Sequence, residues 1–229
     1  MIKRTLGAVA LILGSWTAAG ATDLLPGPVD PPANPWDGFY VGGHAGYGWA
    51  NRFGCFGGSF PASHTCSPPQ FNYNQTGWLA GGQTGYNMVM GSGLLVGLEV
   101  SASLTGITGN LNLPGNSFDG VGDWKYLGTA TARLGWGNDK FLVYAEGGLG
   151  LGGFEYNSAS CNFESNHQGW VYGAGVEAMV SGSNSIFVEY NHFDFKGKDA
   201  SCGGGGGSPA VYTKPKMDVI KVGFNHNFN

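Results

Sequence analysis

Seven ionisable residues stand almost alone in apolar, glycine-rich segments of the chain, and their chemistry depends on where they point. In the run 171–180, VYGAGVEAMV, Glu177 is the single charged residue. A carboxylate buried in apolar surroundings costs several kcal/mol unless it is paired, so such a segment must have one polar face. The seven residues are Glu99, Arg133, Glu146, Glu177, Glu189, Lys221 and His44.

Strict alternation places these residues on one face of each segment. In 94–104, LLVGLEVSASL, every second residue from Leu94 is apolar, whereas the opposite face carries Glu99 and two serines. A period of two predicts a β-strand. The same alternation sets Arg133 against the apolar face of 126–136 and Lys221 against that of the last segment. We therefore predict that the seven residues form an interior polar cluster.

Two functions are open to this interior polar cluster. Its four carboxylates and two bases leave an excess of two negative charges, which one protonated carboxyl or a charged His44 would reduce. The cluster could be a narrow gated path for protons or small ions, or a plug in which charges pair across the lumen. Eight strands leave an interior about filled by side chains, which favours the plug. We expect neither a metal site nor a catalytic residue there.

The elements that must position the cluster are β-strands. Tight turns at 91–93, 138–139 and 182–184 alternate with long connections at 51–75, 108–123, 157–167 and 197–215. No helical period persists beyond the N-terminal segment. An even number of strands with alternating short and long connections is typical of outer-membrane barrels. The sequence predicts an all-β fold, an eight-stranded antiparallel up-and-down transmembrane β-barrel, with strands at 36–50, 76–90, 94–107, 124–137, 140–156, 168–181, 185–196 and 216–228.

The composition favours a barrel whose outer surface faces lipid. Charged residues make up 11% of the chain and aromatic residues 14%, and there are 43 glycines. Soluble domains carry about 25% charged residues. A wide aqueous porin needs about 16 strands, which this chain does not supply. Aromatic residues near strand ends predict an interfacial girdle. These are Trp36, Tyr47, Trp49, Trp78, Tyr86, Trp136, Trp170 and Tyr190.

The N-terminal residues predict export. Residues 1–21 combine the basic Lys3 and Arg4, a short apolar run and an A-x-A cleavage pattern, as in a cleaved signal peptide. Residues 22–35 read as a Pro-rich periplasmic linker, and 36–229 as the barrel. Without the signal, 9 cations face 15 acids, a formal charge of −6, so no nucleic-acid partner is expected. We predict the cell outer membrane, with long loops outside and outer-membrane lipid and lipopolysaccharide as partners.

Four cysteines, all in the predicted long loops, suit an oxidising compartment. We expect two disulfides and favour Cys55–Cys66, which closes a short loop and leaves Cys161 with Cys202. Four cysteines allow three pairings, so the connectivity stays open. A four-cysteine zinc site is the alternative, although no C-x-x-C pair is present.

Several short motifs together resemble the opacity-like, OmpA-type outer-membrane β-barrel family of alphaproteobacteria. They are WDGFYVGG at 36–43, GWVYGAGVE at 169–177 and VEY at 188–190. The C-terminal residues Gly223, His226 and Phe228 are similar to the signal read by the barrel-assembly machinery, although His226 replaces an apolar residue and Asn229 follows Phe228. The resemblance implies envelope-structural or surface-exposed proteins, some described as porins and some as host-interaction or haem-binding proteins.

The leading interpretation is a non-enzymatic integral outer-membrane protein with an envelope-structural and surface-display role, at most a narrow low-conductance pore, and no cofactor. One alternative is a surface adhesin whose long loops bind a host or extracellular ligand, or haem through His64 or His167. The other is a lipid-modifying enzyme that uses His192 and Asp194, for which no neighbouring serine can be placed.

Overall fold

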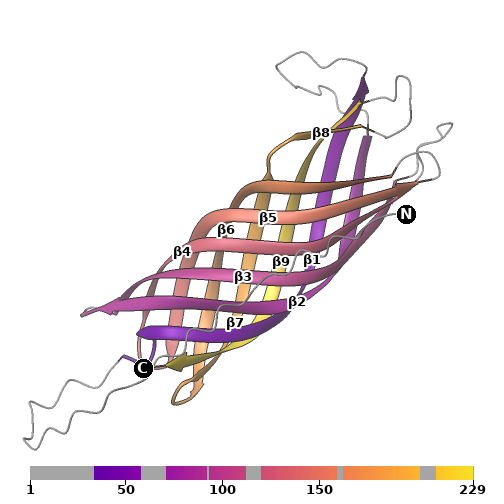
Figure 1. The fold of residues 1–229 in the computed structure, drawn as a ribbon. Helices are drawn as coiled ribbons and strands as arrows, with labels where there is room; N and C mark the ends of the chain where they lie inside the picture. The colour runs from indigo at the N-terminus through magenta and orange to yellow at the C-terminus, as the bar shows by residue number, and fades with distance from the viewer. Residues whose placement is uncertain are drawn as a thin grey trace, which may run out of the picture. The chain divides into compact units, whose positions relative to one another are not determined.

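Strands account for nearly all of the residues that the structure, a computed structural model, describes (Figure 1). These residues are 34–57, 71–91, 93–111, 120–158, 162–201 and 210–228. They belong to one compact unit, Ala33–Asn229, and include no helix long and apolar enough to cross a membrane. The strands are β1 (Gly38–Gly57), β2 (Phe71–Met90), β3 (Leu94–Leu111), β4 (Gly120–Gly137), β5 (Phe141–Ser158), β6 (Asn162–Ser181), β7 (Asn184–Phe195), β8 (Lys198–Ser201) and β9 (Ala210–Phe228).

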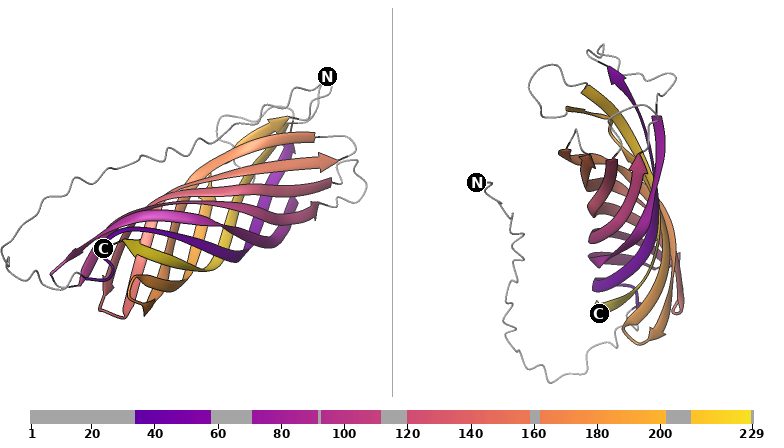
Figure 2. Two further views of the ribbon diagram at one scale, coloured as in Figure 1. Left: turned by 60° about the horizontal axis from the view of Figure 1, so that its bottom comes forward. Right: turned by 90° about the vertical axis from the view of Figure 1, so that its right-hand side faces the viewer.

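The sheet closes on itself, because β9 pairs with β1 as well as with β7 (Figure 2). The short strand β8 does not add a position to the ring. Along β9, β7 pairs as far as Asp194 with Lys216, and β8 takes over with Lys198 opposite Thr213. Strand β8 therefore continues the line of β7, and the predicted eight-stranded antiparallel barrel is confirmed.

The tight turns lie where the sequence predicted them, at one end of the barrel, which we call the turn end. Gly93 has a positive φ of 81° and donates its N–H to the carbonyl of Met90 at 2.9 Å. The Asn138 side chain accepts the amides of Lys140 and Phe141, both at 2.9 Å. These contacts stabilise two sharp reversals between neighbouring strands.

The opposite end, which we call the loop end, differs from the prediction. Strand β1 runs to Gly57 rather than to residue 50, and β6 begins at Asn162 rather than at 168. Cys55 thus lies in a strand and not in a loop. The alternation that marked the strands fades here, because their outward side chains become polar while backbone pairing continues to Gly54 opposite Phe71.

Some predictions fall outside the described residues. The signal peptide, most of the linker, His64, Cys66, Cys161 and Cys202 belong to this group, as does the side chain of Cys55. The disulfide pairing therefore stays a prediction.

The outward face is divided into an apolar band and a polar rim. The band reaches from the turn end to a ring of aromatic side chains, Trp49, Trp78, Tyr126, Trp170 and Tyr190, all 41–61% exposed. Beyond this aromatic ring the outward residues include Lys125, Glu155, Glu164 and Lys216. Such a band flanked by aromatic residues suits the hydrocarbon layer of a membrane.

The interior consists of three layers rather than the small polar filling that the sequence predicted. Near the turn end, Trp36 packs with Leu95, Leu142 and Tyr144. Trp36 is only 1% exposed, so its assignment to the outer aromatic girdle was wrong. Polar residues fill the middle. Toward the loop end lies a larger apolar cluster that includes Trp124, Phe154, Phe195 and Met217.

Candidate functional site: a polar network inside the barrel

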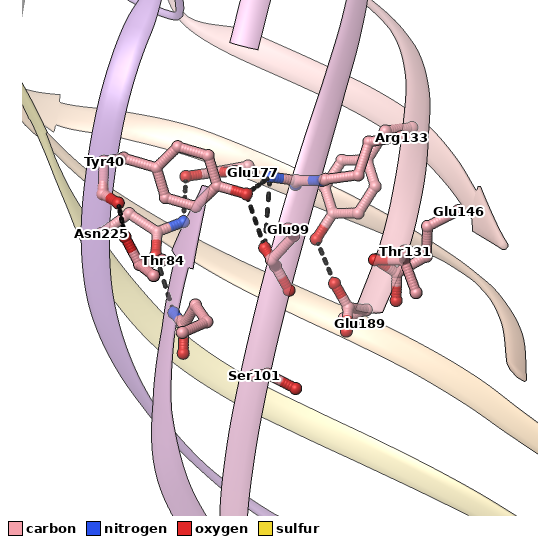
Figure 3. A network of polar contacts seen from close by, with 12 residues as sticks. Tyr40, Thr84, Glu99, Ser101, Thr131, Arg133, Glu146, Glu177, Glu189 and Asn225 are labelled. Carbon is pink, nitrogen blue, oxygen red and sulfur yellow. Dashed lines mark hydrogen bonds and ion pairs between the residues drawn. The ribbon is translucent and has the colours of Figure 1, made fainter. Parts of the chain in front are cut away.

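All seven residues of the interior polar cluster point into the barrel and are at most 7% exposed. Figure 3 shows five of them, Glu99, Arg133, Glu146, Glu177 and Glu189. They come from strands on every side of the ring, because alternate side chains of each strand face inward. The ring of strands thus brings together charges that are more than 170 residues apart in the chain, such as His44 and Lys221.

Arg133 lies at the centre of the network. Its Nη1 donates to the Tyr40 hydroxyl at 2.6 Å and lies 3.4 Å from Glu99 Oε2. Its Nη2 lies 3.4 Å from Glu177 Oε2, and the guanidinium stacks 3.7 Å above the Tyr144 ring. The Tyr40 hydroxyl in turn donates to Glu99 at 2.6 Å. One cation therefore neutralises two carboxylates and is held in place by two aromatic rings.

Lys221 forms the second ionic centre with Glu189. The Lys221 Nζ lies 2.5 Å from Glu189 Oε1. The same carboxylate accepts the Tyr144 hydroxyl and the Asn191 amide, both at 2.7 Å. A buried ion pair is stable only when its remaining oxygen atoms are also hydrogen-bonded, as they are here.

Glu146 has the least support of the four carboxylates. It accepts the Thr131 hydroxyl at 3.1 Å, and among the described residues no lysine or arginine lies within ion-pair distance of it. Its oxygen atoms lie within 4.8 Å of those of Glu99 and Glu189. Three such carboxylates could hold a hard cation, but Arg133 and Lys221 already neutralise two of them.

His44 joins the network through neutral partners. Its Nδ1 lies 2.6 Å from Gln83 Oε1, and its Nε2 lies 2.7 Å from the Ser103 hydroxyl. The Gln83 amide donates to Asn225 Oδ1 at 2.7 Å, and the Asn225 amide donates to Glu177 at 2.7 Å. Since only an N–H can bind Gln83 Oε1, Nδ1 carries the proton.

Among the described residues, little open space lies beside the network. The hollow beside it, lined by Ser101, Thr129, Asn191 and Lys221 among others, has a volume of about 10 Å³. That volume holds roughly one water molecule. The Trp36 layer lies toward the turn end and the Trp124 layer toward the loop end. The polar network is therefore enclosed between two apolar layers.

Several interior residues that contact the interior polar cluster were not predicted as part of it. Tyr40, Tyr144, Ser185 and Asn225 all bind the ionic residues and share their alternation, which is the signal that could have found them.

Arg52, a further buried cation, was missed because strand β1 was predicted to end before it. Its guanidinium lies 3.4 Å from the centre of the Phe154 ring, and its Nη2 lies 3.4 Å from His167 Nε2. This region lies beyond the aromatic ring. Burial lowers the pKa of Arg52 to about 10, although Tyr73 partly offsets that effect.

The residues predicted for the two alternative functions, lipid modification and haem binding, lie outside the interior polar cluster. His192 faces outward, as predicted, but its Nδ1 lies 2.6 Å from Asp218 rather than from Asp194, which pairs with Lys214 at 3.3 Å. Among the described residues no serine hydrogen-bonds to His192. His167 is only 2% exposed, so it is not the exposed haem ligand that the sequence suggested.

The C-terminal motif lies on β9 beside β1. The Phe228 ring points outward, with its centre 5.8 Å from that of Phe39. His226 Nδ1 lies 2.9 Å from Asn184 Oδ1. Gly223 has no room for a side chain, since a Cβ would lie 2.4 Å from the Gly43 carbonyl oxygen. The role of these residues in assembly stays a prediction.

A closed eight-stranded barrel with an outward apolar band, an aromatic ring and a charged interior is an outer-membrane β-barrel protein. The sequence matches the family described as "Outer membrane protein beta-barrel domain" over residues 7–228. The chain therefore belongs to this family and is a protein of the cell outer membrane.

Known proteins from alphaproteobacteria resemble the chain over most of its length. It is 24% identical to the 31 kDa outer-membrane immunogenic protein of Brucella melitensis biotype 1 (strain ATCC 23456 / CCUG 17765 / NCTC 10094 / 16M), with 93% of this chain and 94% of the relative covered. It is 29% identical to the 22 kDa outer membrane protein of Rhizobium leguminosarum bv. viciae, with 73% of this chain and 68% of the relative covered. The crystal structure of OprG from Pseudomonas aeruginosa superimposes with a TM-score of 0.55 at 14% identity, with 84% of this chain and 97% of OprG covered. This last likeness concerns the fold alone.

Proposed function

We propose that the protein is a non-enzymatic barrel that stabilises the outer membrane and displays loops on the cell surface, and that it conducts ions poorly or not at all. The observation that carries this proposal is the enclosure of the interior polar cluster between two apolar layers. A hydrated ion would have to displace Trp36 and its neighbours, break the Arg133 and Lys221 pairs, and then cross the layer around Trp124. Each step breaks contacts that are formed in the folded barrel.

Planar bilayers test the sealed lumen directly. We expect the purified full-length protein to show heat-modifiable mobility on gels, as a folded barrel does, and to show no large, stable single-channel steps. The control is the same preparation after boiling, which removes the folded form. Large, stable steps from the folded protein alone would refute the sealed lumen.

Surface recognition is the second candidate. Strands β1, β2 and β6 have 20 residues each, whereas about 9–11 suffice to cross a bilayer, so they project well beyond the membrane. The Brucella relative is named an immunogenic protein. These facts support a role for the outer loops in contact with a host or extracellular ligand. Binding of labelled cells to host-cell surfaces, compared with cells that lack the protein, tests this role.

A haem-binding role and a lipid-modifying role have less support. Addition of haem to the folded protein tests the first, and we expect no shift of the haem absorbance band, since His167 is buried. The second rests on the outward His192–Asp218 pair. We expect lipid A from cells that overproduce the protein to be chemically unchanged. For assembly, we propose that the barrel-assembly machinery reads Gly223, His226 and Phe228.

A further inference from the structure

A small pocket lies where β7 gives way to β8. Figure 1 shows β8 at the loop end. Strand β7 ends at Phe195, and the amide of Lys196 then donates to the Gln168 carbonyl of β6 at 2.8 Å. The pocket has a volume of about 220 Å³ and is lined by Asn166, His167, Gln168, Lys196, Gly197 and Lys198. Sites for drug-sized ligands measure about 300–1,000 Å³, so this pocket suits a single headgroup.

Lys196 and Lys198 give the pocket a positive charge that no described carboxylate neutralises. Among the described residues, neither Lys196 nor Lys198 forms an ion pair, and the Lys198 Nζ contacts only the Asn166 carbonyl, at 3.2 Å. The buried ring of His167, one of the lining residues, lies on the inner side of strand β6. Burial first, and then the positive charges of Arg52 and Lys198, lower the pKa of His167 to about 3. The positive potential at the pocket comes from Lys196 and Lys198, which line it, and it favours an anion.

The height of the pocket indicates where that anion comes from. Gln168 lies two residues beyond Trp170 on the outward face of β6. Two strand residues span about 7 Å. The headgroup layer extends roughly 5–8 Å beyond the hydrocarbon on each side of a bilayer. Because Trp170 belongs to the aromatic ring at the hydrocarbon boundary, the pocket lies within the layer of lipid headgroups.

We propose that this pocket binds the phosphate group of an outer-leaflet lipid. Lys196 and Lys198 supply ammonium groups to the phosphate oxygen atoms, and the side-chain amides of Asn166 and Gln168 supply neutral donors. The acyl chains of the same lipid then lie along the apolar band below, beside Trp170. This inference does not depend on whether the lumen conducts or the loops bind a ligand.

Strand β4, two strands along the ring from β6, provides a control lysine. Lys125 of β4 also lies beyond the aromatic ring, but its Nζ is 3.2 Å from Glu155 and 3.5 Å from Asp123. Its charge is therefore already neutralised. Lys125→Gln and Lys196→Gln remove the same charge from the rim, one from a paired lysine and one from the pocket.

The test uses the full-length protein folded in a zwitterionic detergent and titrated with lipid A, with bound lipid counted by native mass spectrometry. We expect Lys196→Gln to bind lipid A about fivefold more weakly and Lys196→Gln/Lys198→Gln about 30-fold more weakly, because each lysine near an anionic surface contributes about a fivefold gain in affinity. Lys125→Gln should bind as the parent does. Heat-modifiable mobility shows that each variant is folded.

Inorganic phosphate separates the two sources of the anion. The proposal predicts that it competes with lipid A only at concentrations far above those of the lipid, because it lacks acyl chains. If inorganic phosphate binds as tightly as lipid A, the pocket is a phosphate site but not a lipid site, and the assignment is overturned. Equal loss of lipid A in the pocket double variant and in Lys125→Gln also overturns it.

Discussion

Among the interior carboxylates, Glu177 shows how much a single residue contributes to the network. It accepts the Ser185 hydroxyl and the Asn225 amide and pairs with Arg133 at 3.4 Å. Replacement by leucine would leave all three donors short of a partner. Breaking a buried ion pair by removing one member costs up to about 3–5 kcal/mol, and the cost here falls toward the lower end because Arg133 keeps Glu99 as a partner.

We therefore expect Glu177→Leu to lower the midpoint of urea unfolding clearly, whereas Val176→Leu should change it little. Val176 is the next residue in β6 but faces outward and is 53% exposed, so the two variants compare the two faces of one strand. Unfolding in detergent, followed by tryptophan fluorescence, measures both midpoints. Equal midpoints would mean that Glu177 does not hold the network together.

His167 makes the stability of the loop end depend on pH. Its folded pKa of about 3 lies below the value of about 6.5 expected in the unfolded chain. Between these values the unfolded chain binds one more proton than the folded barrel, so this contribution to stability is present above pH 6.5 and is lost as the pH falls toward 3. The loss amounts to at most about 1.4 kcal/mol per pH unit.

Unfolding midpoints measured across that range should fall less steeply for His167→Phe than for the parent. Phenylalanine suits the site, because His167 already packs against Trp124, Phe154 and Phe195. Carboxylates elsewhere titrate equally in both proteins, so the difference between the two slopes isolates His167. Parallel curves would show that His167 is not held neutral by its surroundings.

Alternation predicted which charged residues face inward, but it could not predict which of them meet. The pairing of Lys221 with Glu189 and of Arg133 with Glu99 and Glu177 depends on the register between strands. Register is set by the whole closed sheet and not by any one segment. Tyr144 illustrates the same limit, because an aromatic residue on the polar face makes sense only once Arg133 lies over its ring.

At the scale of the strands, regular alternation correctly predicted which side chains face inward, and this prediction failed where a bulge interrupts the alternation. The pairing of β4 shifts between Trp124 and Tyr126, so Tyr126 faces outward while Trp124 faces inward. Strict alternation would place both outside. A bulge leaves one residue unpaired and reverses the faces beyond it. Nothing in the residue types around Lys125 marks that extra residue, so the apolar layer at the loop end was not predicted.

The turns, by contrast, follow from local chemistry, and the turn between β2 and β3 offers a matched pair of glycines. Gly93 has a φ of 81°, and a Cβ there would lie 2.5 Å from the Gly137 carbonyl oxygen. At Gly91 a Cβ would meet nothing within 4 Å. We expect Gly93→Ala to destabilise the barrel by about 1–2 kcal/mol, the usual cost of a left-handed conformation for a residue with a side chain.

Gly91→Ala should leave stability nearly unchanged. Urea midpoints of the two variants, measured under one set of conditions, give the comparison. A loss of equal size at both glycines would show that flexibility of the whole turn, and not the backbone conformation of Gly93, sets its stability.

For the whole molecule, the sequence predicted the class of fold because the count of strands and the alternation of short and long connections are global features. It did not predict the three interior layers, because it assigned Trp36 to the interfacial girdle and gave Trp124 no position. Trp36 and Trp136 lie near the same end of the barrel but face opposite ways, with 1% and 60% exposure. The Trp36 Nε1 donates to the Asn138 carbonyl at 2.6 Å, which fixes the ring inside.

Because Trp36 faces inward and Trp136 outward, their fluorescence can test which face of the barrel meets lipid. Single-tryptophan variants, with the other tryptophans replaced by phenylalanine, can be folded into vesicles of phosphatidylcholine with brominated acyl chains. Bromine quenches fluorescence on contact. The ring of Trp136 lies in the apolar band, so its emission should be strongly quenched, while that of Trp36 should stay near its intensity in unbrominated vesicles. Trp170 and Trp124 form the corresponding outward and inward pair toward the loop end, with 61% and 0% exposure. Strong quenching of Trp36 or Trp124 would mean that lipid reaches the interior, and the sealed barrel would then be wrong as a description of the protein in its membrane.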